Sequence, residues 1–302
     1  MKRPSFFILG AAKCGTTSLQ GYLSRHPEVY MSDPKEPHFF EAEYEKGFDF
    51  YWQRYFSGWQ GERAIGEARH RNLFLPFVAP RIAESVPDAK LLIILRNPVD
   101  RCYSHWWHWF SRGVESRSFD DALEADLKRI DAGIDFEGDE GARQWTRNFD
   151  HSVGRNEFTC YVDSGYFSRQ ISRYMALFPA EQLKVLFLED FKGGADEALS
   201  DVWPFLGVDP DFVLPPTSAK NQAGSLLNYR LSRFVKAIKV SGLLPRRVKD
   251  RVKRIANRVG TKRPSLSPST RRDLVEHYRP YNLELEKLTG RDLSHWTAQA
   301  DD

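Results

Sequence analysis

Residues 6–18 read FFILGAAKCGTTS, an apolar run that leads into a glycine-containing loop and then into helix-compatible residues. This order predicts a strand, a phosphate-binding loop and a helix. In nucleotide triphosphatases the loop lysine directly follows the second glycine and reaches the β- and γ-phosphates. Here Thr16 has that place, and Lys13 lies in the middle of the loop. Backbone N–H groups can still hold a phosphate, so we expect a donor without a γ-phosphate, with Lys13 at the bridging atom of its leaving group.

Length and composition favour one soluble domain. The chain has 302 residues, of which 41% are hydrophobic, so a single α/β domain over residues 1–302 can bury a large core. The apolar run near the N-terminus is too short to cross a bilayer, and it leads into the loop rather than into a cleavage site. The cysteines Cys14, Cys102 and Cys160 are too widely spaced for a disulfide framework or a zinc site. We therefore expect a cytoplasmic protein with free thiols.

Apolar runs and helical spacing alternate along the chain. Residues 91–95 and 183–188 are apolar runs typical of strands buried in a parallel sheet, and residues 64–67 are a further strand candidate. Residues 118–130 and 168–178 have helical spacing. This order predicts an α/β fold with a P-loop-like, doubly wound, mainly parallel sheet flanked by helices. In such sheets ligands bind beyond the carboxyl ends of the strands.

A second polar motif follows the strand candidate at 91–95. Residues 96–104 read RNPVDRCYS, in which Pro98 suits the first position of a helix and Asp100 its first turn. Arg96 then lies at the mouth of the helix and Ser104 about two turns along, where both can hold one phosphate. A guanidinium recognises phosphate but not metal, so we expect no magnesium site. The alternative is that Arg96 pairs with a nearby carboxylate and Ser104 faces solvent.

These motifs resemble those of the sulfotransferases that use 3′-phosphoadenosine 5′-phosphosulfate (PAPS). Residues 13–18 look like the 5′-phosphosulfate loop of that family, and residues 96–104 look like its 3′-phosphate motif. Further segments resemble the family in matching order: 165–167, 188–191, 205–207 and 278–296.

The resemblance implies PAPS as co-substrate and 3′-phosphoadenosine 5′-phosphate (PAP) as product, with no metal. It implies that the 5′ end is held by Lys13, Cys14, Gly15, Thr16, Thr17 and Ser18. It implies that the 3′ side is held by Arg96, Ser104, Tyr166, Lys220 and Asn221. Negative charge accumulates on the leaving oxygen during sulfuryl transfer, so Lys13 is also a catalytic candidate.

The general base is sought in residues 35–41, KEPHFFE. Pro37 favours an extended backbone at Glu36, and residues two apart in an extended segment project to one side, so Glu36 and His38 are predicted neighbours. The segment resembles the heparan-sulfate branch, in which the matching glutamate is the base and the matching histidine supports it. We expect Glu36 as base, His38 orienting or replacing it, and Glu41 as a weaker candidate. The alternative is that Glu36 pairs with a cation and His38 is structural.

The acceptor is predicted from the same resemblance. A carbohydrate hydroxyl is the first choice, and a lipid, a peptide or a polyketide-type hydroxyl is the alternative. Heparan sulfate itself is not expected, because the chain lacks the membrane anchor and the second-half disulfide of that branch. After Glu67, where relatives often have a proline, the chain reads ARHR. Arg69, His70 and Arg71 can recognise an acidic acceptor, but a solvated polar loop explains them equally well. Glu41 and Glu67 are further candidates for contact with the acceptor.

The next helix contains two histidines three residues apart, His105 and His108, within the run HWWHW. That spacing suits metal binding, but no third ligand accompanies it, and we expect packing or ring stacking instead.

Basic residues gather in the C-terminal third. Residues 230–263 hold thirteen Lys or Arg and one acid, a local charge of +12 that leaves −9 for the rest of a chain of net charge +3. Apolar residues at helical spacing predict amphipathic helices here, and we describe 222–265 as a basic helical lid or insertion. Four roles stay open for this segment. It can contact an anionic membrane, guide a polyanionic acceptor, dock a partner protein, or form a solvated lid over the active site. No nucleic-acid partner is expected.

Two other classes compete with a sulfotransferase. A P-loop kinase or NTPase requires a Gly-Lys pair and an acidic metal ligand, which the motifs lack. A silent nucleotide-binding module would tolerate the loss of Lys13 and Glu36, and both are present.

Overall fold

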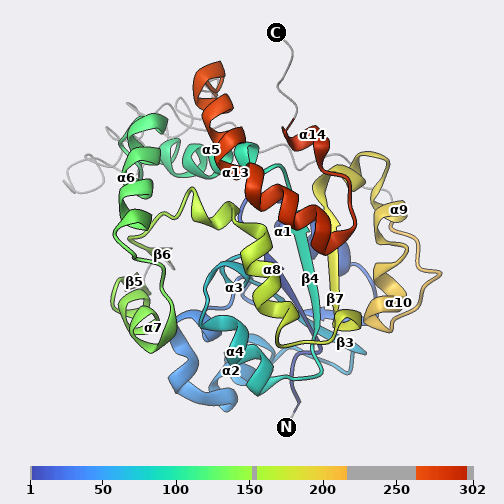
Figure 1. Cartoon of the computed structure of the whole chain (residues 1–302). Coiled ribbons are helices and arrows are strands. Elements are labelled where there is room, and N and C mark those ends of the chain that lie inside the picture. Colours follow the sequence, from blue (N-terminus) through green and yellow to red (C-terminus); the bar gives the residue numbers. More distant parts are fainter. Residues whose placement is uncertain (1, 152–154, 216–262, 298–302) are drawn as a thin grey trace, which may run out of the picture.

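The computed structural model describes residues 2–151, 155–215 and 263–297, built around a five-stranded sheet (Figure 1). The strands lie in the order β2-β3-β1-β4-β7, and every neighbouring pair is parallel. Their bounds are β1 Phe6–Gly10, β2 Val29–Met31, β3 Ala64–Ala68, β4 Lys90–Leu95 and β7 Leu183–Phe187. Because the strands are parallel, the carboxyl ends of β1, β3 and β4 meet at one edge of the sheet.

Helices cover both faces of the sheet. The described helices are α1 Thr16–Leu23, α2 Gly47–Tyr55, α3 Arg71–Phe74, α4 Val78–Ser85, α5 Pro98–Phe110, α6 Phe119–Asp131, α7 Gly138–Arg147, α8 Phe167–Met175, α9 Ala195–Leu199, α10 Val202–Leu206, α13 Pro268–Thr289 and α14 Ser294–Thr297. A short π-helical turn, η1 Phe39–Glu43, and an antiparallel pair, β5 Phe149–Asp150 with β6 Arg155–Asn156, lie beside them.

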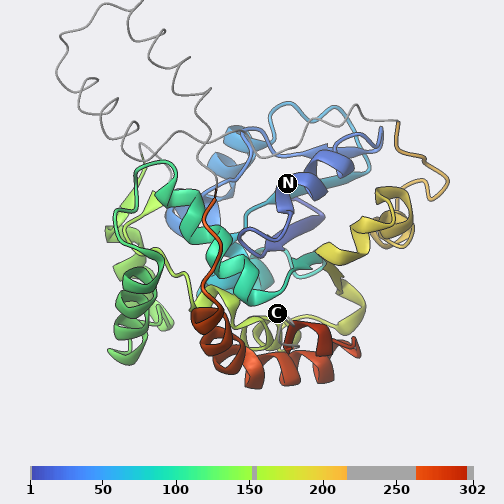
Figure 2. The same cartoon turned by 90° about the horizontal axis from the view of Figure 1, so that it is seen from above.

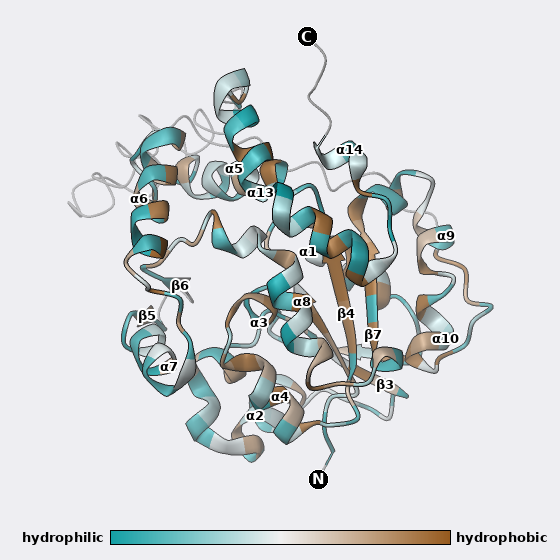
Figure 3. Cartoon of the chain, viewed as in Figure 1, coloured by the Kyte–Doolittle hydropathy of each residue, from teal (hydrophilic) through white to brown (hydrophobic). Residues whose placement is uncertain are grey.

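The hydrophobic core forms two layers because side chains alternate along each strand. Phe7 and Leu9 of β1 pack with α2, α4 and α8 on one face, whereas Phe6 and Ile8 pack with α1 and α10 on the other. Figure 2 shows α13 and α1 on opposite sides of the sheet. Strand β4 is apolar over its whole buried length, as Figure 3 shows, which is typical of a strand covered on both faces.

Local sequence explains where α5 begins. Asn97 is the N-cap, and its side chain accepts hydrogen bonds from the N–H groups of Val99 at 2.9 Å and Asp100 at 3.4 Å. Pro98 takes the first helical position, where a missing N–H costs nothing. Arg96 is thereby held directly after β4, beside the end of β1.

The predicted α/β, doubly wound, mainly parallel fold is confirmed. The strand expected at 183–188 is β7, and the helices expected at 118–130 and 168–178 are α6 and α8. Residues 216–262 lie outside the described residues, so the single-domain boundary at 1–302 and the basic lid at 222–265 stay predictions. Among the described helices, none combines the length and the apolarity that crossing a bilayer requires. The cytoplasmic location also stays a prediction.

Candidate active site

The phosphate loop, residues 11–15, joins β1 to α1. Gly15 caps α1 with φ of 101°, a left-handed backbone that favours glycine. A Cβ at this position would also lie 2.9 Å from Leu188 Cδ1. No side chain of the described residues caps α1, and its first turn carries no acid. The first N–H groups of α1 are therefore available to an anion.

Cations converge on this loop. Lys13 Nζ lies 3.2 Å from His108 Nδ1, and Arg112 Nη1 lies 2.7 Å from the same nitrogen. Both cations can only donate, so Nδ1 accepts and the imidazole is neutral. Burial, with Lys13 and Arg112, lowers the pKa of His108 to about 3. Burial, followed by the charges of Arg112 and Arg96, also lowers the pKa of Lys13. A bound anion would relieve this crowding of positive charge.

Arg96 has an acidic neighbour but is not tightly paired. Its Nη2 lies 3.7 Å from Asp100 Oδ2, and 28% of its side chain is exposed. Asp100 is held more closely by Arg271 of α13, at 2.7 Å. Arg96 therefore keeps donors for a phosphate, and Ser104 lies half-buried two turns along the same helix.

The other loop residues differ in exposure. Cys14 is fully buried, and burial raises the pKa of its thiol to about 12, so it contributes backbone rather than a thiolate. Thr16 is buried, Ser18 is half-buried and Thr17 is exposed. The Thr17 hydroxyl accepts a hydrogen bond from Lys35 Nζ at 2.5 Å.

Tyr166 packs in an aromatic stack, and its hydroxyl already has a polar partner. Its ring stacks on Tyr281 with centroids 4.1 Å apart, and its hydroxyl lies 2.8 Å from His277 Nε2. An adenine contact through that hydroxyl would compete with His277. Lys220 and Asn221 lie outside the described residues, so their expected contacts with the nucleotide stay predictions.

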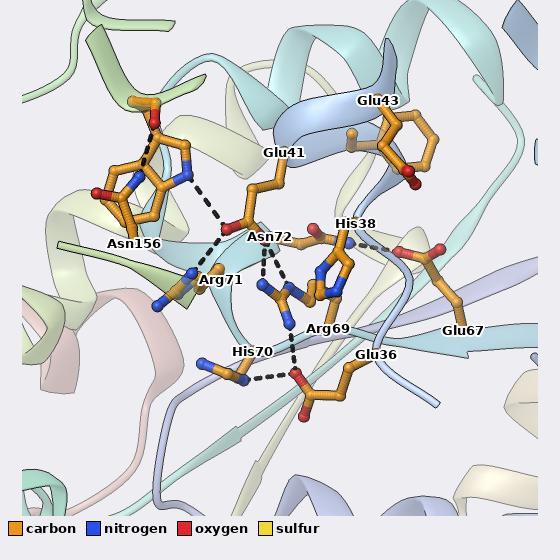
Figure 4. Close-up of polar contacts among 12 residues, drawn as sticks. Glu36, His38, Glu41, Glu43, Glu67, Arg69, His70, Arg71, Asn72 and Asn156 are labelled. Carbon is orange, nitrogen blue, oxygen red and sulfur yellow. Dashed lines mark hydrogen bonds and ion pairs between the residues drawn. The ribbon is translucent and has the colours of Figure 1, made fainter. Parts of the chain in front are cut away.

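The Glu36 carboxylate lies at the sheet edge beside the loop (Figure 4). Its Oε2 accepts from Arg69 Nη1 at 3.0 Å and from His70 Nδ1 at 2.8 Å, and Lys35 Nζ lies 3.9 Å from Oε1. Burial opposes ionisation of Glu36, but His70 and Arg69 outweigh it and hold its pKa well below the usual range. Glu36 is therefore an anion at neutral pH.

His38 does not pair with Glu36 as the sequence suggested. Glu36 has φ of 63°, so the backbone is left-handed there and the alternation of an extended segment does not apply. The His38 ring packs on Phe149 instead, with centroids 5.0 Å apart, and its buried Nδ1 has no hydrogen-bond partner among the described residues. Burial, with the charge of Arg69, lowers the pKa of His38 to about 4. The imidazole beside Glu36 is that of His70.

Glu41 forms the centre of a buried ion cluster, drawn in Figure 4. It accepts hydrogen bonds from Arg69 Nε at 2.7 Å, Arg71 Nη1 at 2.8 Å and Trp145 Nε1 at 3.2 Å, and from Arg69 Nη2. Burial opposes the charge, but the arginines lower the pKa of Glu41 to about 2. Arg69 bridges Glu41 to Glu36 and is only 3% exposed, so it positions carboxylates rather than facing solvent or an acceptor.

Glu67 lies deeper, at the end of β3. It is fully buried and accepts from Tyr51 Oη at 2.5 Å and Asn72 Nδ2 at 2.6 Å, so it ties α2 and α3 to the sheet. Burial raises its pKa to about 7. The acceptor contact suggested for Glu67 does not fit this interior position.

His105 is buried, and its Nε2 accepts from Trp109 Nε1 at 3.1 Å. This is the packing role expected for the histidine and tryptophan run. Within residues 2–151, 155–215 and 263–297, no group of three potential metal ligands is found.

A pocket of about 440 Å³ opens beside Glu36. It is lined by Pro34, Lys35, Glu36, His38, Ala42, Glu43, Lys46, Arg54, Tyr55 and His151. This pocket is the acceptor-site candidate, because a molecule bound in it would lie next to the Glu36 carboxylate.

The tertiary structure adds two residues that sequence reasoning did not assign to the reaction centre, His108 and Arg112. His108 lies on α5 one turn after Ser104, and Arg112 lies just beyond the end of this helix, with its Nη1 2.7 Å from His108 Nδ1. Lys13 and Arg112 both contact His108 Nδ1, and the charges of His70 and Glu36 also act on the pKa of His108.

Three comparisons with known proteins bear on this site. Residues 3–291 match the family model described as the sulfotransferase domain. A bacterial sulfotransferase crystal structure, from Alicyclobacillus acidocaldarius, is 32% identical and has a TM-score of 0.69, covering 99% of this chain and 100% of that one. The bovine bifunctional heparan sulfate N-deacetylase/N-sulfotransferase 2 is 26% identical over 95% of this chain and 30% of its own length. The Dictyostelium discoideum membrane-associated sulfotransferase kil1 is 24% identical over 68% of this chain and 56% of its own length. The chain thus spans only about a third to a half of these two curated relatives.

Proposed function

The chain belongs to the sulfotransferase domain family and is an enzyme of that class, and from this we propose that it transfers a sulfuryl group from PAPS to a carbohydrate hydroxyl. The observation that carries the proposal is the pair of cationic sites at one sheet edge. Lys13 lies in the loop at the end of β1, and Arg96 follows β4.

The donor chemistry suits these two sites. PAPS carries a sulfuryl group on its 5′-phosphate and a separate 3′-phosphate, so its binding needs an anion site at each end. The loop and the first turn of α1 supply N–H groups for the 5′ end, and Arg96 with Ser104 supplies donors for the 3′-phosphate. After burial, the charges of Arg112 and Arg96 lower the pKa of Lys13, which supports a single donor region.

Transfer proceeds as an in-line displacement at sulfur. The acceptor oxygen forms a bond to sulfur while the bond from sulfur to the 5′-phosphate oxygen breaks, and the electron pair goes to that phosphate oxygen. The Lys13 ammonium stabilises the charge that develops there, an effect typically worth about 10²–10³ in rate. The acceptor proton passes to a general base built on Glu36, which lines the pocket proposed for the acceptor.

The carbohydrate acceptor is supported by the bovine relative, whose name assigns it to heparan sulfate. The pocket beside Glu36 is also polar, as a sugar site requires, with Tyr55, Arg54 and Lys46 in its wall.

Nucleotide selectivity tests the donor site. We expect wild-type protein to bind PAP more tightly than adenosine 5′-phosphate, which lacks the 3′-phosphate, in calorimetry without added metal. Arg96→Ala should remove about 10–100-fold of that preference, the equivalent of one charge-assisted hydrogen bond. The matched control is Arg279→Ala, because Arg279 is exposed and paired with Glu276 away from the site.

Turnover tests the chemistry. With [³⁵S]PAPS and a mixture of glycan oligosaccharides, Lys13→Ala should lower transfer by about 10²–10³ while PAP affinity changes by less than about tenfold. Two results would rule the proposal out. One is equal affinity of the wild-type protein for PAP and ATP, and the other is full transfer activity in both Lys13→Ala and Arg96→Ala.

A further inference from the structure

His70 occupies a position that orients its imidazole for proton transfer. It lies two residues beyond the end of β3, and its Nδ1 is 2.8 Å from Glu36 Oε2. An ionised carboxylate can only accept, so Nδ1 carries a proton, and in the neutral form of the ring Nε2 is the acceptor. Figure 4 shows that Nε2 points away from Glu36, and no hydrogen bond to it is found among the described residues.

His70 also lies close to the phosphate loop. It lines one internal pocket with Ala11 and Ala12 of that loop. Gly10 allows the backbone of residue 70 to lie this close to β1, since a Cβ at position 10 would lie 3.0 Å from the His70 carbonyl oxygen. His70 thus shares a pocket wall with the donor loop and, through Nδ1, contacts the Glu36 carboxylate that lines the proposed acceptor pocket.

Resting on the function proposed above, we propose that His70 is the catalytic residue that takes the acceptor proton, at Nε2, and that Glu36 is its positioning residue. The carboxylate selects the tautomer with hydrogen on Nδ1 and stabilises the imidazolium that forms. In the transfer step the acceptor O–H bond breaks, its proton goes to Nε2, and its oxygen bonds to sulfur as the 5′-phosphate oxygen leaves with the electron pair. Solvent then removes the proton from His70.

Glu36 is poorly suited to take the proton directly. Its Oε2 already accepts two charged or strongly polar donors, Arg69 and His70, and Lys35 faces Oε1. These contacts stabilise the anion, and a strongly stabilised anion is a weak base near neutral pH. The same stabilisation makes Glu36 a firm anchor for an imidazolium.

The other charged groups around His70 come from three elements. Glu36 faces it from the segment before η1, His105 and His108 face it from α5, and Arg69 and Arg71 flank it on its own segment. Burial lowers the pKa of both α5 histidines, which remain neutral, and Glu36 is the anion that contacts the His70 ring.

The decisive variant is His70→Asn in the full chain. The asparagine Nδ2 can replace Nδ1 as the donor to Glu36, so a merely structural role would be preserved, but nothing replaces Nε2. We expect kcat for PAP release, measured with water and with p-nitrophenyl β-glucoside as acceptor probes, to fall by about 10²–10⁴. PAP affinity and the thermal midpoint should stay near wild type.

His70→Ala provides a rescue test. Its lost activity should return in part on addition of free imidazole, and its rate–pH profile should lack the limb that proton uptake by His70 would give the wild type. Glu36→Gln, whose amide oxygen still accepts from Nδ1, should keep more activity than His70→Asn. His295→Ala is the control, because His295 is exposed on α14.

The outcomes separate this inference from the function on which it rests. Full activity of His70→Asn would overturn the role of His70 but not the proposed function. The same holds if Glu36→Gln is less active than His70→Asn and imidazole does not rescue His70→Ala. Wild-type protein that neither binds PAP nor releases it from PAPS would overturn both.

Discussion

Replacing Glu41 with glutamine should destabilise the protein strongly, because it removes the anion from a cluster of buried cations. Glu41 is fully buried, and Arg69 and Arg71 both donate to it. In Glu41→Gln, Arg69 keeps only Glu36 as an anionic partner among its described contacts, and Arg71 loses the carboxylate that holds it.

Two routes give a similar magnitude. A pKa of Glu41 lowered from 4.5 to about 2 corresponds to roughly 3 kcal/mol, at about 1.4 kcal/mol for each pH unit. Removing one partner of a buried ion pair costs about 3–5 kcal/mol. With about 2.1 cal/mol/K of unfolding entropy per residue over 302 residues, this range lowers Tm by about 5–8 °C.

The measurement is differential scanning calorimetry at neutral pH, with Glu140→Gln as the matched control. Glu140 also accepts from two arginines, Arg143 and Arg147, but on the surface, so its Tm should not change measurably.

The difference between wild type and Glu41→Gln should also depend on pH. The Glu41 pKa is lower in the folded state, so its contribution is complete above about pH 4.5 and is lost as the pH falls toward about 2. A Tm loss no larger than that of Glu140→Gln, or a difference that grows on acidification, would refute the reasoning.

Two other perturbations test the surroundings of the site. The pKa of Glu67 is raised from 4.5 to about 7 in the folded state, so stability should decline as the pH rises from about 5 to about 8; Glu67→Gln should abolish that decline in melts at both pH values, and an unchanged decline would contradict the assignment. Gly10→Ala should lower kcat more than PAP affinity, because its Cβ would lie 2.7 Å from Leu73 Cβ and push residues 70–73 outward, at a cost of about 1–3 kcal/mol in unfolding free energy. Unchanged turnover in a folded Gly10→Ala variant would show that this close approach does not position His70.

Relatives extend beyond the region that this chain matches, so acceptor choice in those proteins can depend on parts that this chain does not share. The pocket beside Glu36 lies within the described residues and is where acceptor specificity can be altered by substitution. Arg54 is exposed in its wall and is a suitable first position for such changes.

The fold and the shapes of the phosphate loop and of the start of α5 were predictable because their signals are local. Gly15 marks a left-handed turn, Asn97 and Pro98 mark a helix start, and the apolar run at 91–95 marks a strand covered on both faces. Each of these depends on backbone preferences of a few neighbouring residues, and the rule for parallel sheets then places the loop and Arg96 at one edge.

The contacts of the proposed proton-transfer site depended on the packing of distant segments. Glu36 and His70 are 34 residues apart, and the left-handed backbone of Glu36 turns it away from His38 and toward Arg69 and His70. Arg69 looked like a solvent-facing cation, yet the fold buries it against Glu41 and Glu36. Whether a charge is buried, and which opposite charge meets it, depends on how the strands and loops pack, and periodicity along the chain carries no record of that packing.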